Sequence, residues 1–166
     1  MTSDAWLSSY ETIYADARQA WKEAVLDKLK QYDGNFFQAY STTPFVVPCG
    51  NTIDEEAAKA DGADTAVFVL SRIAGENADR HDTEGDYFIT EEEKALLAQV
   101  SASYDNVVLV INTGGLIDLA FTEAFANIKS IVQFMQAGQE GGSAFADILS
   151  GSVNPSGKMT DSWAYT

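Results

Sequence analysis

The sequence contains few of the residues on which several common kinds of protein chemistry depend. Its 166 residues include one cysteine, one histidine and three prolines. A single cysteine, Cys49, cannot form a disulfide within the chain, which fits a reducing compartment. One histidine without paired cysteines does not match the common zinc patterns. Basic residues are also scarce, because 10 lysines and arginines stand against 25 aspartates and glutamates.

This acidic balance limits the partners that the chain can have. A formal net charge of −15 repels the phosphate backbone of nucleic acids and the surface of an anionic membrane, so we expect neither as a partner. No stretch approaches the 18 apolar residues of a membrane span. The first residues, MTSDAWLSSYETIYAD, have neither the basic nor the apolar region of a signal peptide. Together with the single cysteine, these features lead us to expect a cytoplasmic location.

The composition is that of an ordinary globular protein. Hydrophobic residues make up 46% of the chain and charged residues 21%. The length suggests one domain, or part of one, with a substantial core.

The first third of the chain is predicted to be mainly helical. Aromatic and aliphatic residues recur at helical spacing over residues 4–31, and Asp33-Gly34 ends the pattern. At this spacing Trp6, Tyr14 and Trp21 indicate a core stripe rather than a surface for stacking sugars. A loop over residues 40–50 and a short helix over residues 53–60 follow. We interpret residues 1–62 as a helical lead-in that packs on residues 63–166, and we treat both as one domain.

The remainder alternates between two kinds of element. Apolar runs predict buried strands at residues 65–71, 106–111 and 128–135, and a further strand is expected to begin within 159–163. Helices are predicted at 90–103, within 115–126 and at 140–149. The alternation predicts a parallel sheet with right-handed crossovers and strands buried on both faces. The fold class is therefore α/β, a three-layer sandwich with a mainly parallel sheet flanked by helices. Three strands are few for such a sheet, which indicates that part of the domain is missing.

Each predicted strand leads into a polar, glycine-rich loop, at residues 71–87, 112–118 and 136–144. Ligands of open parallel sheets bind beyond the carboxyl ends of the strands, so these loops mark the expected functional edge. Neither GxGxxG nor GxxxxGK[ST] occurs. The acidic residues of the first loop lack EF-hand spacing, and His81 has no GxSxG elbow to complete a Ser-His-Asp triad. We expect no cofactor and no metal.

One carboxyl group in the first loop is a candidate acid–base catalyst. Glu76 lies between Gly75 and Asn77, with Arg72 and Arg80 four residues before and after it. Desolvation in a cleft would raise the pKa of Glu76 and make it a general acid, whereas the arginines would lower that pKa. Taken by itself, the same pattern also describes a solvated loop charge.

Several segments together resemble a known family. The runs GENADR, GDYFITEEEKALL, NVVLVINTGGLID and AGQEGGSAFADILSGSVNPSGKMTDSWA are similar to the C-terminal α/β sandwich domain of glycoside hydrolase family 3, the β-glucosidase family. The similarity extends from about residue 63 to residue 164, and its most specific part is NPSGK preceded by GQEGG. The first sixty residues match more loosely.

The resemblance implies a role for each candidate residue. Family members are retaining glycosidases in which a (β/α)₈ barrel domain supplies an Asp nucleophile, and Glu76 falls on the general acid/base. The implied partners are a β-glucoside or oligosaccharide substrate and the barrel domain of the same protein. Arg72, Arg80 and Asp86 either position the loop or contact sugar hydroxyls, with ion pairing inside the loop as the alternative. Asn77 replaces a glycine of the family motif.

The resemblance also sets expectations for the chain by itself. It implies a truncated (α/β)₆ sandwich that cannot turn over glycosides alone, because a (β/α)₈ barrel needs roughly 250 residues. The alternative function is a non-catalytic carbohydrate-binding or protein-interaction module. An exposed edge strand would favour a homodimer.

Overall fold

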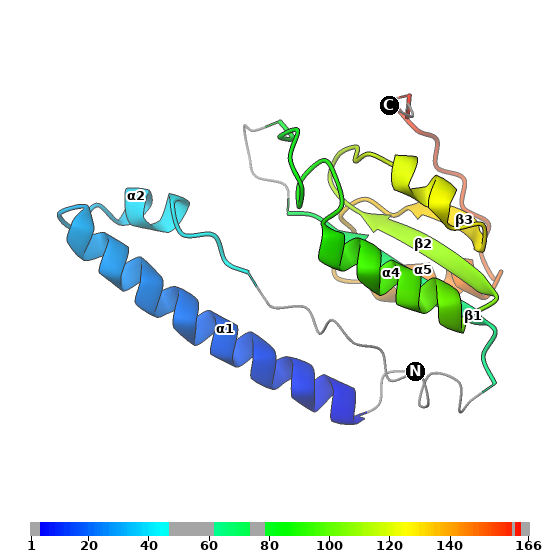
Figure 1. Ribbon diagram of the computed structural model, residues 1–166, viewed down its shortest axis with the longest axis horizontal. Coiled ribbons are helices and arrows are strands. Elements are labelled where there is room, and N and C mark those ends of the chain that lie inside the picture. The colour runs from blue at the N-terminus through cyan, green and yellow to red at the C-terminus, as the bar shows by residue number, and fades with distance from the viewer. Residues whose placement is uncertain (1–3, 47–61, 74–78, 161, 164–166) are drawn as a thin grey trace. The chain divides into compact units, whose positions relative to one another are not determined.

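The computed structural model describes residues 4–46, 62–73, 79–160 and 162–163. Contacts divide the chain into two compact units, Met1–Gly50 and Asn51–Thr166. In chain order the elements are α1 (Asp4–Gln31), α2 (Phe36–Ser41), β1 (Thr65–Ser71), α4 (Glu91–Ser103), β2 (Asn106–Asn112), the 3₁₀ helix η1 (Ala120–Ala124), β3 (Ile128–Gln133) and α5 (Gly141–Leu149) (Figure 1).

The long helix α1 begins and ends where the sequence predicts. Asp33 and Gly34 adopt left-handed backbone angles, with φ of 48° and 82°. The N–H of Gly34 bonds to the carbonyl of Leu29 at 2.9 Å, which closes the last turn of the helix. The predicted end of the helix at Asp33-Gly34 is therefore confirmed.

The short helix α2 was not predicted from the sequence. Asn35 caps it by accepting a hydrogen bond from the N–H of Gln38 at 3.1 Å. Trp21 of α1 packs edge-on against Tyr40 at 5.5 Å between ring centroids, and its indole N–H donates to the carbonyl of Thr43 at 2.7 Å. Trp21 thus has the structural role that its helical spacing indicates. The predicted helix at 53–60 lies outside the described residues.

The sheet is parallel, as predicted. Its strands run in the order β1-β2-β3, with Phe68 opposite Leu109 in the first pair and Leu109 opposite Ile131 in the second. The prediction of a strand that begins within residues 159–163 is wrong, because the described residues there form no strand. Instead, Trp163 donates its indole N–H to the carbonyl of Ile117 at 2.6 Å, so this segment packs on a connecting loop.

Helices cover both faces of the sheet, which confirms the α/β fold class. Figure 1 shows α4 in front of the strands and α5 behind them. The predicted capping box of α4 is present, because Thr90 Oγ1 accepts from the N–H of Glu93 and Glu93 Oε2 accepts from the N–H of Thr90. The segment predicted as helical within 115–126 contains only η1. No described helix is long and apolar enough to cross a membrane.

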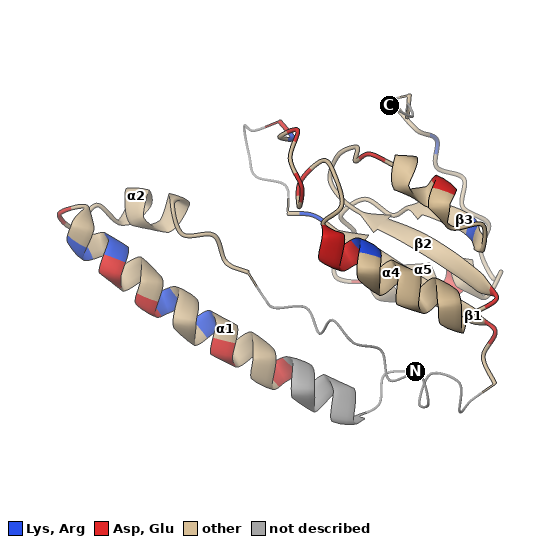
Figure 2. Cartoon of the chain, viewed as in Figure 1, with Lys and Arg blue, Asp and Glu red and all other residues tan. Residues whose placement is uncertain are grey.

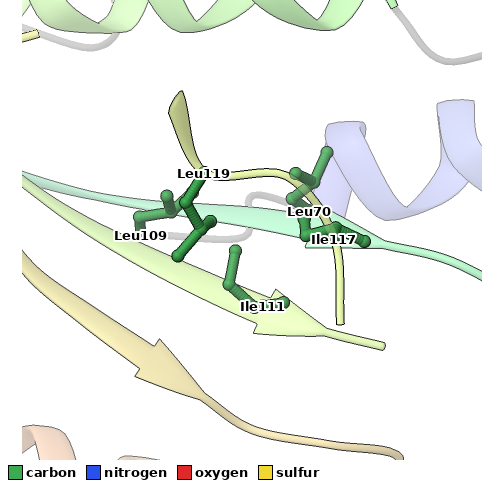
Figure 3. Packing of buried hydrophobic residues seen from close by; sticks show 5 residues of the cluster. All are labelled: Leu70, Leu109, Ile111, Ile117 and Leu119. Carbon is green, nitrogen blue, oxygen red and sulfur yellow. The ribbon is translucent and has the colours of Figure 1, made fainter. Parts of the chain in front are cut away.

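The main core lies on one face of the sheet, between the strands and the two crossover connections, and Val110 of β2, which is 1% exposed, is buried on the opposite face. Figure 3 shows its first cluster, which consists of Leu70, Leu109, Ile111, Ile117 and Leu119. A second cluster contains Leu97, Val100 and Val107, and Phe68 and Ile128 pack against both clusters. Strands in sequential parallel order with right-handed crossovers carry both connections on the same face.

Burial of β1 on both faces was expected and is wrong. Val67 and Val69 are 45% and 54% exposed, whereas Leu70 is 3% exposed. The physical reason is the topology, since both crossovers cover the face opposite to Val67 and Val69. A continuous apolar run is therefore compatible with a strand that is buried on one face only.

Candidate active site at the carboxyl edge of the sheet

The loops that leave the three parallel strands meet at one edge of the sheet, as predicted. The N–H of Asp118 in the second loop bonds to the carbonyl of Tyr87 in the first loop at 2.9 Å. Gln133 at the end of β3 donates its side-chain amide to the carbonyl of Thr113 at 3.4 Å. The second loop therefore contacts both the first loop and the end of β3, from which the third loop leaves.

The candidate acid/base lies outside the described residues. Residues 74–78 include Glu76, so the structure describes the two stems of its loop, up to Ile73 and from Asp79 onward. The site is therefore built from the residues that hold these stems. They include the other three candidates, Arg72, Arg80 and Asp86.

Arg72 is at the point where the chain leaves β1, and its side chain is 5% exposed. Its Nε donates to the carbonyl of Asp86 at 3.0 Å. Its Nη1 donates to the carbonyl of Ser71 at 2.8 Å and to Glu93 Oε1 at 2.6 Å. Its Nη2 donates to the carbonyl of Phe88 at 3.3 Å and to Glu93 Oε2 at 2.7 Å. These contacts occupy all five N–H donors of a guanidinium group.

Glu93 is a residue at this site that sequence reasoning did not place there. The sequence identified it as the capping-box residue of α4, which is correct but incomplete. Its carboxylate also forms a two-pronged ion pair with Arg72, the strong geometry for a guanidinium and a carboxylate. The two partners are 21 positions apart in the sequence, so no local signal indicates this pair. Figure 2 shows the acidic first turn of α4 in which Glu93 lies.

Arg80 and Asp86 form the second ion pair of the loop, at 2.6 Å between Nη1 and Oδ1. Asp86 Oδ2 also accepts the backbone N–H of His81 at 2.8 Å. The Arg80 hydrogen bond, followed by that of the His81 backbone, holds the pKa of the Asp86 carboxyl below its usual value. A side chain added at Gly115 would place its Cβ 3.7 Å from Arg80 Nε, so Arg80 reaches the second loop.

Asp86 should make the stability of the chain depend on pH in the acid range. Because its folded pKa is lowered, its contribution is fully present above the unfolded pKa of about 3.9 and is lost as the pH falls through the folded pKa. The side chains of the pair are 17% and 26% exposed, so we expect Asp86→Asn to cost about 1 kcal/mol at pH 7. Urea denaturation of the variant and of the unmodified chain at pH 7 and pH 3 measures the loss of unfolding free energy at each pH. Equal losses at pH 7 and pH 3 would contradict the assignment of this stabilisation to the charged Asp86 carboxylate.

The predicted strand at residues 128–135 ends earlier, at Gln133, and a strained residue lies just before the third loop. Met135 adopts a left-handed φ of 58°, a conformation that non-glycine residues rarely adopt outside functional or tightly constrained sites. Its sulfur accepts a hydrogen bond from the Gln133 side chain at 3.1 Å. Nothing in the local sequence, QFMQAG, indicates this conformation.

The described residues contain no group of three or more His, Cys, Asp or Glu side chains placed to hold a metal ion. The described residues at this edge provide carboxyl groups, guanidinium groups and backbone amides. The two arginines that flank Glu76 in the sequence are each paired with another carboxylate, Glu93 or Asp86.

Comparison with known proteins relates the whole chain to one family. A family model described as the glycosyl hydrolase family 3 C-terminal domain matches residues 3–166. A β-glucosidase of Ruminococcus albus is 28% identical over 98% of this chain and 17% of its own length. β-Glucosidase A of Butyrivibrio fibrisolvens is 36% identical over 61% of this chain and 15% of its own length. The crystal structure of a β-glucosidase from Paenibacillus barengoltzii aligns with a TM-score of 0.67 and 30% identity, over 86% of this chain and 18% of that one.

The chain therefore spans less than a fifth of the length of these relatives. The fold of the Paenibacillus barengoltzii enzyme in the aligned region agrees with the parallel sheet and flanking helices described above.

Proposed function

Because the chain belongs to the family of glycosyl hydrolase family 3 C-terminal domains, we propose that it contributes the general acid/base, Glu76, to a retaining β-glucosidase-like enzyme. The substrate would be a terminal β-linked sugar of a glucoside or oligosaccharide. The observation that carries the proposal is the family match over residues 3–166, which contains the GENADR segment between β1 and α4.

The proposed mechanism needs two carboxyl groups about 5–5.5 Å apart across the sugar. An Asp of a (β/α)₈ barrel attacks the anomeric carbon while Glu76 donates its proton to the leaving oxygen, and a glycosyl–enzyme ester forms. Glu76, now a carboxylate, then removes a proton from water. The resulting attack on the anomeric carbon releases the sugar with its configuration retained and restores both carboxyl groups.

The surroundings of the loop support this role for Glu76. A general acid needs a raised pKa, and unpaired arginines nearby would lower it. Arg72 and Arg80 are instead neutralised by Glu93 and Asp86. The flanking charges therefore offset one another, and desolvation against a partner domain would dominate the pKa of Glu76.

The proposal also concerns how the domain is organised and which surface packs against the barrel. We treat residues 1–62 and 63–166 as one domain that packs beside the barrel in the complete protein. The exposed Val67 and Val69 offer an apolar surface for such packing. The position of β1 at an edge of the sheet would also suit a homodimer.

The purified chain should show no measurable hydrolysis of aryl β-glucosides, because the nucleophile lies in another domain. Joined to its barrel, the same chain should support turnover with retention of configuration. Product anomers observed by proton NMR distinguish retention from inversion. Robust turnover by the chain alone that Glu76→Gln abolishes would overturn the shared site, and binding of glucosides without turnover in the joined protein would favour the carbohydrate-binding module.

A further inference from the structure

We propose that Glu93, acting through Arg72, is a positioning residue for the proposed acid/base: the Arg72–Glu93 pair fixes both stems of the Glu76 loop to the first turn of α4. This inference rests on the proposed function of Glu76. It assigns Glu93 a role beyond that of a helix cap, and it assigns Arg72 a role in which the side chain does not contact the sugar.

The hydrogen bonds of Arg72 exclude it from binding substrate directly in this arrangement. All five of its donors already have partners, at distances between 2.6 and 3.3 Å. Its side chain is 5% exposed. A sugar hydroxyl could accept a hydrogen bond from Arg72 only in place of one of these partners.

The partners of Arg72 lie at both ends of the loop. Ser71 is at the end of β1, before the loop, whereas Asp86 and Phe88 are on the segment that returns toward α4. One guanidinium group therefore holds together two stems that are separated in sequence by residues 74–78 and the Arg80–Asp86 pair.

Glu93 fixes this guanidinium to the helix. Its Oε1 accepts from Arg72, and its Oε2 accepts both from Arg72 at 2.7 Å and from the backbone N–H of Thr90 at 2.9 Å. Thr90 in turn caps α4 by accepting from the N–H of Glu93 at 3.1 Å. The loop stems, the cap and the helix thus form one connected network. A network of this kind holds a neighbouring group more precisely than a free loop does.

Two consequences for catalysis follow from this geometry. Misplacing an acid by about 1 Å can cost about 10²-fold in rate. In addition, removing the charge of Glu93 leaves the positive charge of Arg72 without its paired carboxylate, and an unpaired cation on the stem of the loop favours the charged form of a carboxyl group near it. Both effects act on proton donation, so they matter most when the leaving group is poor.

The test compares Glu93→Gln with Glu92→Gln in the barrel-containing protein. Both variants remove one negative charge from the first turn of α4, but Glu92 is exposed and makes no contact with Arg72 in the bonds described above. For Glu93→Gln we expect kcat on alkyl glucosides to fall about tenfold to 10²-fold, with a much smaller change on dinitrophenyl glucoside. The basic limb of the pH profile should move to lower pH. Glu92→Gln should match the unmodified protein.

Arg72→Lys provides an independent version of the test, because a lysine keeps the charge but cannot span the same partners. It should show the same dependence on the leaving group. Equal behaviour of Glu93→Gln and Glu92→Gln would overturn the inference. So would a loss that is uniform across leaving groups and follows the decrease in Tm, because that pattern indicates a purely structural role. If Glu76→Ala itself retains full activity, the proposed function fails, and this result is independent of the Glu93 variants.

Discussion

Replacing Glu76 with alanine in the barrel-containing protein is expected to slow hydrolysis of alkyl β-glucosides by about 10²–10⁴-fold. The alanine variant cannot protonate the leaving oxygen, so the loss should shrink for dinitrophenyl glucoside, whose leaving group needs no proton. With this activated substrate, breakdown of the glycosyl–enzyme ester should limit the rate. Added azide should then restore turnover by attacking the ester directly and should release a glycosyl azide.

A matched control is available in the same loop. Glu84 is exposed and lies on the returning stem, so Glu84→Ala should leave kcat and the pH profile unchanged. Steady-state kinetics with substrates of graded leaving-group pKa, with and without azide, measure all these effects. Unchanged kinetics in Glu76→Ala, or equal losses in the two variants, would show that Glu76 is not the acid/base.

Truncating Ile111 to alanine is expected to destabilise the chain by about 2–5 kcal/mol. Ile111 is fully buried in β2 and belongs to the first core cluster with Leu109 and Ile117. Because the described sheet has only three strands, few other side chains can fill the cavity. Urea denaturation of the purified chain, followed by circular dichroism, measures the change.

Ile73 provides the matched isoleucine for this experiment. It is 83% exposed just beyond β1, so Ile73→Ala should change the free energy of unfolding by no more than about 0.5 kcal/mol. Similar losses at Ile73 and Ile111 would contradict the location of the core. A small loss at Ile111 alone would show that the neighbouring side chains repack.

Local signals in the sequence predicted most of the secondary structure. The bounds of α1 and β1 were predicted correctly, and so was the capping box of α4, because helical periodicity, Asp33-Gly34 and Thr90 with Glu93 act over a few residues. The short helix α2 was missed, since its cap is a single asparagine and its length is little more than one turn. The additional strand expected near Trp163 was wrong because a tertiary hydrogen bond to Ile117 determines the path of that segment.

At the candidate site, too, local motifs were predicted from the sequence and long-range contacts were not. Glu76 was identified from its place in a motif, and it stays a prediction. The arrangement around it depends on partners far apart in sequence. Arg72 was recognised as a loop residue, but nothing near it indicates that Asp86, Phe88 and Glu93 would occupy its donors.

The sequence by itself determined the class of fold, the order of its elements and the family, because these depend on periodicity, on capping residues and on motifs that are contiguous along the chain. Only the tertiary structure decided which face of β1 is buried, that Met135 adopts a strained conformation, and that Glu93 is paired with Arg72. The physical reason is the range of the interactions. Hydrogen bonds within a helix or cap span a few residues, whereas the burial of a face and the pairing of an ion follow from how crossovers and loops are brought together across the sheet.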